Sequence, residues 1–298
     1  MNGKNSAAAD IIVFVLGMGR SGSSATARVM SLCGGRLPES LLPPNGSNPT
    51  GYWEPSPVVH LNARFLRASG SSFFDTQLDQ EVSEDTPLGR EFVSEIAELL
   101  QAYRGTASDA PLILKEPRIS VLLPFWLAAV ERTDFSPRVV IPVRHPNEVA
   151  SSLGAWKCLS RAHTAELWLK YNLLAERHTR HLPRVFVSYA SLLEDWRREV
   201  LAISQALALA LTHNDEVDQF LNSGLRHTIT EDESVLSETP WLREVYRALV
   251  CACRGADVDA ELLDAAFLDL SQAQATGSLP VIRSFGIDFG VPAPKASG

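Results

Sequence analysis

Short continuous runs of apolar residues alternate along the chain with longer stretches in which apolar residues recur at helical spacing. The continuous runs cover residues 11–16, 112–114, 138–143 and 184–188, and their content of Val, Ile and Leu is typical of strands buried on both faces. The helical stretches cover about residues 23–33, 89–103, 120–132, 146–181, 200–207, 240–254 and 258–270. Strands that alternate with helices predict an α/β fold of three layers, in which a parallel sheet lies between helices on both faces.

The two ends of the chain differ from the part between them. Residues 1–10 and 291–298 are small, polar or proline-bearing, and we expect a disordered tail at the N-terminus and a loose one at the C-terminus. Between them no internal repeat, low-complexity tract or linker interrupts the pattern, so we predict a single domain over residues 11–290. Residues 36–57 contain six prolines and predict a long irregular loop, a feature that is usually functional in a compact domain.

Composition and charge narrow the range of functions. The chain has 298 residues, of which 45% are hydrophobic, and 27 Lys and Arg against 35 Asp and Glu give a net charge of −8. This balance disfavours nucleic acid and a polybasic membrane contact, because both require a positive surface field. No apolar run is long enough to span a membrane, and no Cys or His spacing matches a zinc site. We therefore expect a cytoplasmic protein with four reduced cysteines and no metal.

Three cations stand immediately beyond predicted strands. Arg20 follows the first strand, Lys115 the second and Arg144 the third. In open parallel sheets, ligands bind outside the carboxyl ends of the strands. We therefore expect these three side chains to form one local basic pocket for an anionic ligand, although the chain as a whole is acidic.

A glycine-rich loop follows the first strand and opens the first helix. Gly17 and Gly22 have the spacing of a Walker A loop, whose backbone amides bind phosphate, and Ser24 stands at its Ser/Thr position. Ser23 replaces the Walker A lysine. The loop therefore predicts a phosphate site but weighs against a kinase or a nucleoside triphosphatase, because those enzymes use that lysine.

Two motifs resemble those of the sulfotransferases that use 3′-phosphoadenosine 5′-phosphosulfate (PAPS). Residues 20–24, Arg-Ser-Gly-Ser-Ser, match the [KR]-S-G-[TS]-[TS] loop that wraps the 5′-phosphosulfate, and residues 144–152 match the R-x-P-x-x-V-x-x-S motif that holds the 3′-phosphate. The chain resembles the bacterial branch of this family more closely than its other branches. The residues that carry this resemblance are 17–20, 48–54 (Asn-Pro-Thr-Gly-Tyr-Trp-Glu) and 115–118 (Lys-Glu-Pro-Arg). The resemblance spans about residues 11–210 and implies the P-loop NTPase-like sulfotransferase fold.

The resemblance implies PAPS as co-substrate and adenosine 3′,5′-bisphosphate (PAP) as product, with no metal. We expect the acceptor to be a hydroxyl-bearing small molecule or glycan, and in particular a carbohydrate or glycoconjugate. Tyr189 stands where relatives place a tyrosine that contacts adenine, although packing in the core explains it equally well. The residues expected to bind the nucleotide are Gly19, Arg20, Ser21, Gly22, Ser23, Ser24, Arg144, Ser152 and Tyr189.

Two of the cations are candidates for the chemistry. We expect Arg20, with the amides of residues 22–24, to stabilise the charge that grows on the 5′-phosphate. Lys115 is the candidate for the bridging oxygen or the sulfonate, since relatives use a lysine before Asp/Glu-Pro in that way. Their catalytic partner is a general base.

Glu54 is the preferred base, because several sulfotransferase branches use a glutamate in the segment after the phosphate loop. Its aromatic neighbours Tyr52 and Trp53 can in addition stack against a sugar ring. The alternatives are Glu116 and His60. Arg118 is expected to anchor its loop or the acceptor rather than to take part in the chemistry. Glu116 and Arg118 follow a predicted strand, Glu54 lies in the proline-rich segment, and His60 lies just after that segment.

Two other functions are open from the sequence. One is a P-loop kinase or nucleoside triphosphatase, against which Ser23 and the lack of an obvious Mg²⁺ carboxylate after a strand both weigh. The other is a non-catalytic nucleotide-binding module that kept the phosphate loop. We expect acceptor specificity to lie in residues 36–85 and 210–240, whereas the oligomeric state is unknown.

Overall fold

The computed structural model describes residues 10–46, 48–78, 83–104, 110–157, 159–222 and 234–282. Residues 1–9 and 291–298 of the predicted tails lie outside the described residues, and so does Cys158. Parts of the segments expected to select the acceptor, residues 47, 79–82 and 223–233, also lie outside them. Cys33, Cys251 and Cys253 are free thiols.

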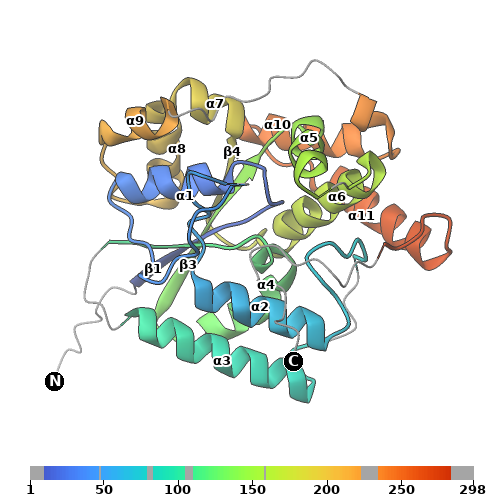
Figure 1. Cartoon of the computed structure of the whole chain (residues 1–298), viewed down its shortest axis with the longest axis horizontal. Coiled ribbons are helices and arrows are strands. Elements are labelled where there is room, and N and C mark those ends of the chain that lie inside the picture. Colours follow the sequence, from blue (N-terminus) through green and yellow to red (C-terminus); the bar gives the residue numbers. More distant parts are fainter. Residues whose placement is uncertain are drawn as a thin grey trace.

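Within the described residues, four parallel strands form the centre of the fold (Figure 1). In the order β2-β1-β3-β4 they are β2 (Leu112–Lys115), β1 (Asp10–Val15), β3 (Phe135–Val143) and β4 (Arg184–Ser188). Val13 of β1 is in register with Ile113 of β2, and Phe14 of β1 with Val139 of β3. The four predicted strands are therefore confirmed, as is the α/β class with a parallel sheet.

The side chains of the strands alternate between two cores. In β1, Ile12 and Phe14 point into one core, while Val13 and Val15 point into the other. The first core is covered by α2 (Ser56–Ala68), α3 (Pro87–Arg104), α4 (Ile119–Val130), α5 (Pro146–Lys157), α6 (Arg161–His178), η1 (Ser234–Ser237), α10 (Leu242–Cys253) and α11 (Ala260–Ala275). The second is covered by α1 (Ser23–Leu32), α7 (Tyr189–Glu194), α8 (Trp196–Leu207) and α9 (Glu216–Asn222). The predicted three layers are thus present, and none of the helices in the described ranges is long and apolar enough to cross a membrane.

Helix α2 lies where the sequence analysis predicts no helix. Its buried residues Val58, Leu61 and Phe65 recur at helical spacing, but the prolines before them favour a loop. Pro55 is the N-cap and Pro57 lies in the first turn, where a missing amide hydrogen costs the helix nothing. The irregular segment therefore ends at Pro55 rather than at residue 57. The short helices α7, α9 and η1 were also not predicted.

The carboxyl ends of β1, β2 and β3 open onto one edge of the sheet. β2 ends at Lys115, the segment after β1 carries Arg20, and Arg144 follows β3 directly. In Figure 1, α1 and α5 both begin on the same side of the sheet as these strand ends. The fold therefore brings together three cations that are far apart in the sequence.

Candidate active site

The phosphate loop (residues 17–24), which joins β1 to the first turn of α1, has a backbone that few residue types tolerate. Gly17 and Gly22 have φ of 103° and 91°, in the left-handed region that glycine favours. At Gly22 a Cβ would lie 2.2 Å from the ring of Tyr189, so this ring rests directly on the loop. Arg20 has φ of 71° although it carries a side chain, a strain of the kind that gathers at functional sites.

Hydrogen bonds fix the phosphate loop to its surroundings. The hydroxyl of Ser120 in α4 accepts a hydrogen bond from the Gly17 amide at 2.8 Å, and the Thr26 hydroxyl donates to the Gly22 carbonyl at 3.1 Å. Gly22 is the N-cap of α1, and the amides of the first helical turn have no partner within the helix. These amides and the positive end of the helix dipole favour an anion above the loop.

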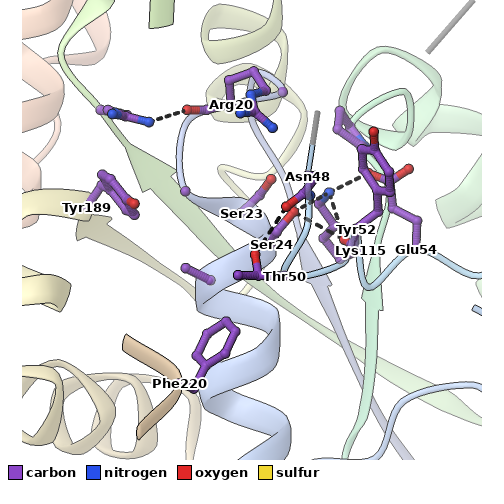
Figure 2. Close-up of a pocket in the computed structure, with 15 residues that line it drawn as sticks. Arg20, Ser23, Ser24, Asn48, Thr50, Tyr52, Glu54, Lys115, Tyr189 and Phe220 are labelled. Atoms are coloured by element: carbon purple, nitrogen blue, oxygen red, sulfur yellow. Dashed lines mark hydrogen bonds and ion pairs between the residues drawn. The ribbon is translucent and has the colours of Figure 1, made fainter. Parts of the chain in front are cut away.

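A pocket of about 580 Å³, part of it open to solvent, lies over the phosphate loop (Figure 2). Its lining comes from the loop, residues 48–54, the end of β2 and the segment after it, the residue after β3, the start of α7 and the second half of α9. The lining residues are Gly19, Arg20, Gly22, Ser23, Ser24, Ala25, Asn48, Thr50, Tyr52, Glu54, Lys115, Pro117, Arg144, Tyr189 and Phe220. Arg20, Lys115 and Arg144 thus share one pocket, as the strand ends predict. Figure 2 shows Tyr189 and Glu54 on opposite sides of the first turn of α1.

One end of the pocket, the lysine end, is a buried ion pair of Lys115 and Glu54. The Lys115 ammonium contacts Oε1 of Glu54 and donates to the Ser24 hydroxyl at 3.2 Å and to the Tyr52 carbonyl at 3.3 Å. The side chains of Lys115 and Glu54 are 3% and 0% exposed. Oε2, the second carboxylate oxygen of Glu54, has no hydrogen-bond partner among the described residues. It is a buried acceptor available to a ligand hydroxyl.

The lysine end depends on the turn formed by residues 48–54. The Asn48 side chain donates to the Gly51 carbonyl at 2.8 Å, and Gly51 has φ of 96°. This geometry folds the turn so that the Tyr52 carbonyl and the Glu54 carboxylate both reach Lys115. The Asn-Pro-Thr-Gly-Tyr-Trp-Glu motif is therefore explained by the contacts it makes to the end of β2.

The other end of the pocket, the arginine end, holds two guanidinium groups. Arg20 donates through Nε to the Ser152 hydroxyl at 2.8 Å, and Arg144 donates through Nε to the Glu148 carboxylate at 2.6 Å. Nη1 of Arg144 donates to the Arg20 carbonyl at 3.1 Å, and the guanidinium lies 4.6 Å from the centroid of the Tyr189 ring. Burial lowers the pKa of Arg20, and the charge of Arg144 lowers it further. The positive charges of Arg20 and Arg144 outnumber the single negative charge of Glu148, so this end of the pocket is net positive.

Not every residue predicted to bind the nucleotide faces the pocket. Arg20 lies at the arginine end rather than beside Lys115, because the Ser152 hydroxyl supplies an acceptor there. Ser152 contacts Arg20 without lining the pocket, and Ser21, within the loop, is buried and does not line the pocket either. The other predicted residues, Gly19, Arg20, Gly22, Ser23, Ser24, Arg144 and Tyr189, all line the pocket.

The alternatives considered for the general base lie elsewhere. Glu116 is fully buried and accepts hydrogen bonds from Arg118 and from Asn62, both at 2.6 Å. Burial raises the pKa of Glu116, while the charge of Arg118 opposes that shift. His60 is exposed on α2 and does not line the pocket. Arg118 and Glu116 therefore anchor the segment after β2. Among the described residues that line the pocket, Glu54 is the one with a carboxylate, so it stays the candidate base.

Sequence reasoning missed Phe220 and Glu148. Phe220 packs edge-on against Trp53 with ring centroids 6.3 Å apart, and it lines the pocket from α9. No sequence signal points to it, because α9 is short and its charged residues are typical of a solvated helix. Glu148 lies in the first turn of α5. Its spacing of four residues from Arg144 could have identified the ion pair.

The pocket presents donors and cations to its ligand, with Glu54 as a carboxylate acceptor. Within the described ranges, no group of three or more His, Cys, Asp and Glu is arranged to hold a metal ion. The arrangement suits a ligand that carries anionic groups at both the lysine end and the arginine end.

Comparison with known proteins gives matches in structure but not in sequence. No family model and no curated protein matches the chain. The sulfotransferase domain of the Synechococcus PCC 7002 olefin synthase is similar over 92% of this chain and 98% of its own, with a TM-score of 0.47 and 18% identity. The chain resembles sulfotransferase domains.

Two further structures carry the same family name. The sulfotransferase domain from the curacin biosynthetic pathway is similar over 88% of this chain and 99% of its own, with a TM-score of 0.43 and 15% identity. The sulfotransferase STF9 from Mycobacterium avium is similar over 85% of this chain and 78% of its own, with a TM-score of 0.44 and 15% identity.

Proposed function

We propose that this chain is a sulfotransferase that moves a sulfuryl group from PAPS to a hydroxyl acceptor. The observation that carries the proposal is one pocket that combines a net positive arginine end, a phosphate loop and a buried Lys115–Glu54 pair. PAPS carries a 3′-phosphate and a 5′-phosphosulfate, so its site needs cations or amides in two places. The acceptor hydroxyl needs a base beside the second of these, and Glu54 supplies it.

The arginine end suits the 3′-phosphate. A phosphate accepts paired hydrogen bonds from a guanidinium, whose N–H groups form a rigid fork. Among the described residues, Nη2 of Arg144 and both Nη groups of Arg20 have no protein partner, so their donors face a ligand. A nucleotide without a 3′-phosphate leaves these two cations beside each other without a counter-charge.

The lysine end favours sulfuryl transfer over phosphoryl transfer with Mg²⁺. In a Walker A loop the Ser/Thr hydroxyl binds Mg²⁺. Here the corresponding hydroxyl, that of Ser24, accepts a hydrogen bond from the Lys115 ammonium at 3.2 Å. A cation that belongs to the chain stands where the divalent ion would bind, and the two repel each other. We therefore assign Lys115 the position beside the 5′-phosphosulfate.

The mechanism follows from the two members of the ion pair. When bound, PAPS supplies a sulfuryl group attached to a phosphate leaving group. Lys115 and the first-turn amides of α1 stabilise the negative charge that develops on the phosphate oxygen. Oε2 of Glu54 accepts the proton of the acceptor hydroxyl, whose oxygen forms a bond to sulfur while the bond between sulfur and the bridging phosphate oxygen breaks and PAP leaves. Burial of the pair strengthens both interactions, because water does not screen them.

The adenine is assigned to the aromatic side of the pocket. Tyr189 already contacts Arg144 and the backbone of Gly22. Phe220 of α9, in the same helix layer as Tyr189, also lines the pocket and lies beside α1 in Figure 2. Purine bases stack on aromatic rings, and this contact needs no hydrogen bond. We therefore propose that Phe220 stacks on the adenine, while Tyr189 packs against Arg144.

Calorimetry with PAP and with ATP and Mg²⁺ tests the proposal. We expect PAP to bind in the presence of EDTA, and ATP with Mg²⁺ to bind at least about tenfold more weakly. A preference for ATP with Mg²⁺, with no measurable binding of PAP, overturns the proposal in favour of a kinase. Binding of PAP without any conversion of PAPS identifies a non-catalytic module instead.

The acceptor is proposed by class, as a hydroxyl-bearing small molecule or glycan that the protein meets in the cytoplasm. The sequence expectation of a carbohydrate or glycoconjugate is part of this proposal. Incubation with ³⁵S-labelled PAPS and a panel of sugars, lipid-linked glycans and phenols tests it directly. Labelled product from phenols alone overturns the carbohydrate assignment and leaves the sulfotransferase assignment intact.

A further inference from the structure

Both arginines of the arginine end are held in the same way by one helix. Arg20 donates through Nε to Ser152, and Arg144 donates through Nε to Glu148. Glu148 and Ser152 are four residues apart on α5, so their side chains leave the same face of the helix in successive turns. Helix α5 therefore presents two acceptors, each to the Nε edge of a guanidinium.

Anchoring through Nε leaves Nη2 of Arg144 and both Nη groups of Arg20 for a ligand. A guanidinium has five N–H donors in a rigid fork, and its two Nη groups form an edge that binds a phosphate bidentately. In Arg144, Nη1 also donates to the Arg20 carbonyl at 3.1 Å, and the Tyr189 ring lies against the guanidinium at 4.6 Å. The orientation of Arg144 is therefore fixed before any ligand binds.

We propose that Glu148 and Ser152 are positioning residues, which aim the Nη edges of Arg144 and Arg20 at the 3′-phosphate. The inference rests on the proposed function, because that function names the phosphate. It gives Ser152 a different role from the one implied by the resemblance, in which this serine holds the phosphate itself. In this chain the Ser152 hydroxyl accepts the Arg20 Nε hydrogen bond and acts through that side chain.

Glu148 has two opposing effects on a bound anion. Its carboxylate orients Arg144, which strengthens the hydrogen bonds to a phosphate. Its negative charge also lies at the arginine end, where it repels the same phosphate. Glutamine separates the two effects, because its amide oxygen accepts the Nε hydrogen bond without carrying a charge.

Calorimetry with PAP and with adenosine 5′-monophosphate (AMP) tests the role of Glu148, because AMP is PAP without the 3′-phosphate. We expect Glu148→Leu to weaken PAP binding about tenfold and AMP binding less than about twofold. Glu148→Gln should keep PAP affinity within about threefold of the wild type or improve it. An equal loss for PAP and AMP, or an equal loss in the Gln and Leu variants, overturns the positioning role.

The background of Arg144→Ala shows whether Glu148 acts through that arginine. If it does, adding Glu148→Leu changes PAP affinity less than about twofold, because nothing is left to orient. A full tenfold loss in this background contradicts the inference, since the effect must then reach the phosphate by another route. Thermal unfolding of each variant separates these effects from a loss of folded protein.

Ser152 has a matched control one position away on the same helix. Ser151 is exposed, and its hydroxyl donates to the Asn147 carbonyl within α5. We expect Ser152→Ala to weaken PAP binding about fivefold and Ser151→Ala to leave it unchanged. In the Arg20→Ala background the effect of Ser152→Ala should disappear. If the loss persists there, the serine binds the phosphate directly and the inference fails for this residue.

These outcomes differ from a failure of the proposed function. If the wild-type chain binds PAP no better than AMP, the donor assignment itself is wrong. If the wild type prefers PAP and the Glu148 and Ser152 variants keep that preference undiminished, only the positioning inference is wrong.

Discussion

The two ends of the pocket manage charge in opposite ways. At the lysine end, Lys115 and Glu54 are buried and neutralise each other, and the Ser24 hydroxyl and the Tyr52 carbonyl complete the contacts of the ammonium. At the arginine end, Arg144 pairs with the Glu148 carboxylate, Arg20 is bound to the Ser152 hydroxyl, and both guanidinium groups keep donors for a ligand. The difference indicates a division of labour: the arginine end contributes affinity for the donor nucleotide, and the lysine end contributes the chemistry.

The substitution Lys115→Met should break the lysine end most severely. It removes the cation that stabilises the leaving group, and we expect kcat to fall at least about 10³-fold. It also leaves the buried carboxylate of Glu54 without its partner, which should lower the free energy of unfolding by about 3–5 kcal/mol. Steady-state kinetics and chemical denaturation measure the two effects.

A double substitution separates these two consequences. Lys115→Met combined with Glu54→Gln removes both charges, so we expect it to recover most of the lost stability and none of the activity. Activity near the wild-type level in the double variant would exclude both residues from the chemistry. Stability that stays as low as in the single variant would show that the charge imbalance is not the cause.

Glu54→Gln should abolish turnover while leaving donor binding in place. The amide oxygen still accepts the hydrogen bond from Lys115, but the side chain no longer takes a proton. We expect kcat to fall about 10²- to 10³-fold and the Kd of PAP to change less than about threefold. A variant with nearly normal kcat would remove Glu54 from the role of base, and a large loss of PAP affinity would contradict the division between the two ends.

Arg144→Ala should have the reverse profile. Loss of a charge-assisted contact to the 3′-phosphate should raise the Kd of PAP about 10- to 100-fold and make the remaining binding less sensitive to salt. At saturating donor, kcat should fall less than about tenfold, because the lysine end is intact. Calorimetry at two ionic strengths and saturation kinetics measure these quantities. A collapse of kcat with unchanged Kd would invert the roles of the two ends.

Of these substitutions, Gly22→Ala should have the smallest effect on activity. It tests whether the Tyr189 ring constrains the phosphate loop. Its Cβ would lie 2.2 Å from the Tyr189 ring, at a residue whose φ is 91°. We expect a loss of about 1–3 kcal/mol in stability and a weaker affinity for PAP. In a Tyr189→Ala background the steric part of this loss should disappear, while the part due to positive φ should remain. Equal losses in both backgrounds would show that the ring does not constrain the loop.

Much of the fold was predictable because its signals are local. The apolar runs of β1 and β3 indicate buried strands, and the glycine spacing at 17 and 22 indicates the phosphate loop that follows. Helix α2 was missed because the prolines at its start resemble a loop, although Val58, Leu61 and Phe65 repeat at helical spacing. The same local signals could not assign the short helices, whose residues are held by tertiary contacts.

The site was predictable in composition but not in its pairings. The three cations and Glu54 were found because strand ends and motifs mark them. The contact of Glu54 with Lys115 joins residues 61 positions apart, and no spacing rule reaches that far. Arg20 was assigned to the 5′-phosphate, whereas its guanidinium contacts Ser152, 132 positions away. Such pairings depend on how the strand ends meet in three dimensions.

Comparison of PAP with AMP on the wild-type chain is the measurement that tests the division between the two ends most directly. The nucleotides differ by the 3′-phosphate, which is the group assigned to Arg20 and Arg144. In calorimetry without Mg²⁺, the account predicts that PAP binds about 100-fold more tightly than AMP, and that this ratio falls as the salt concentration rises. Equal affinities for the two nucleotides would contradict it, because the arginine end would then not recognise the 3′-phosphate.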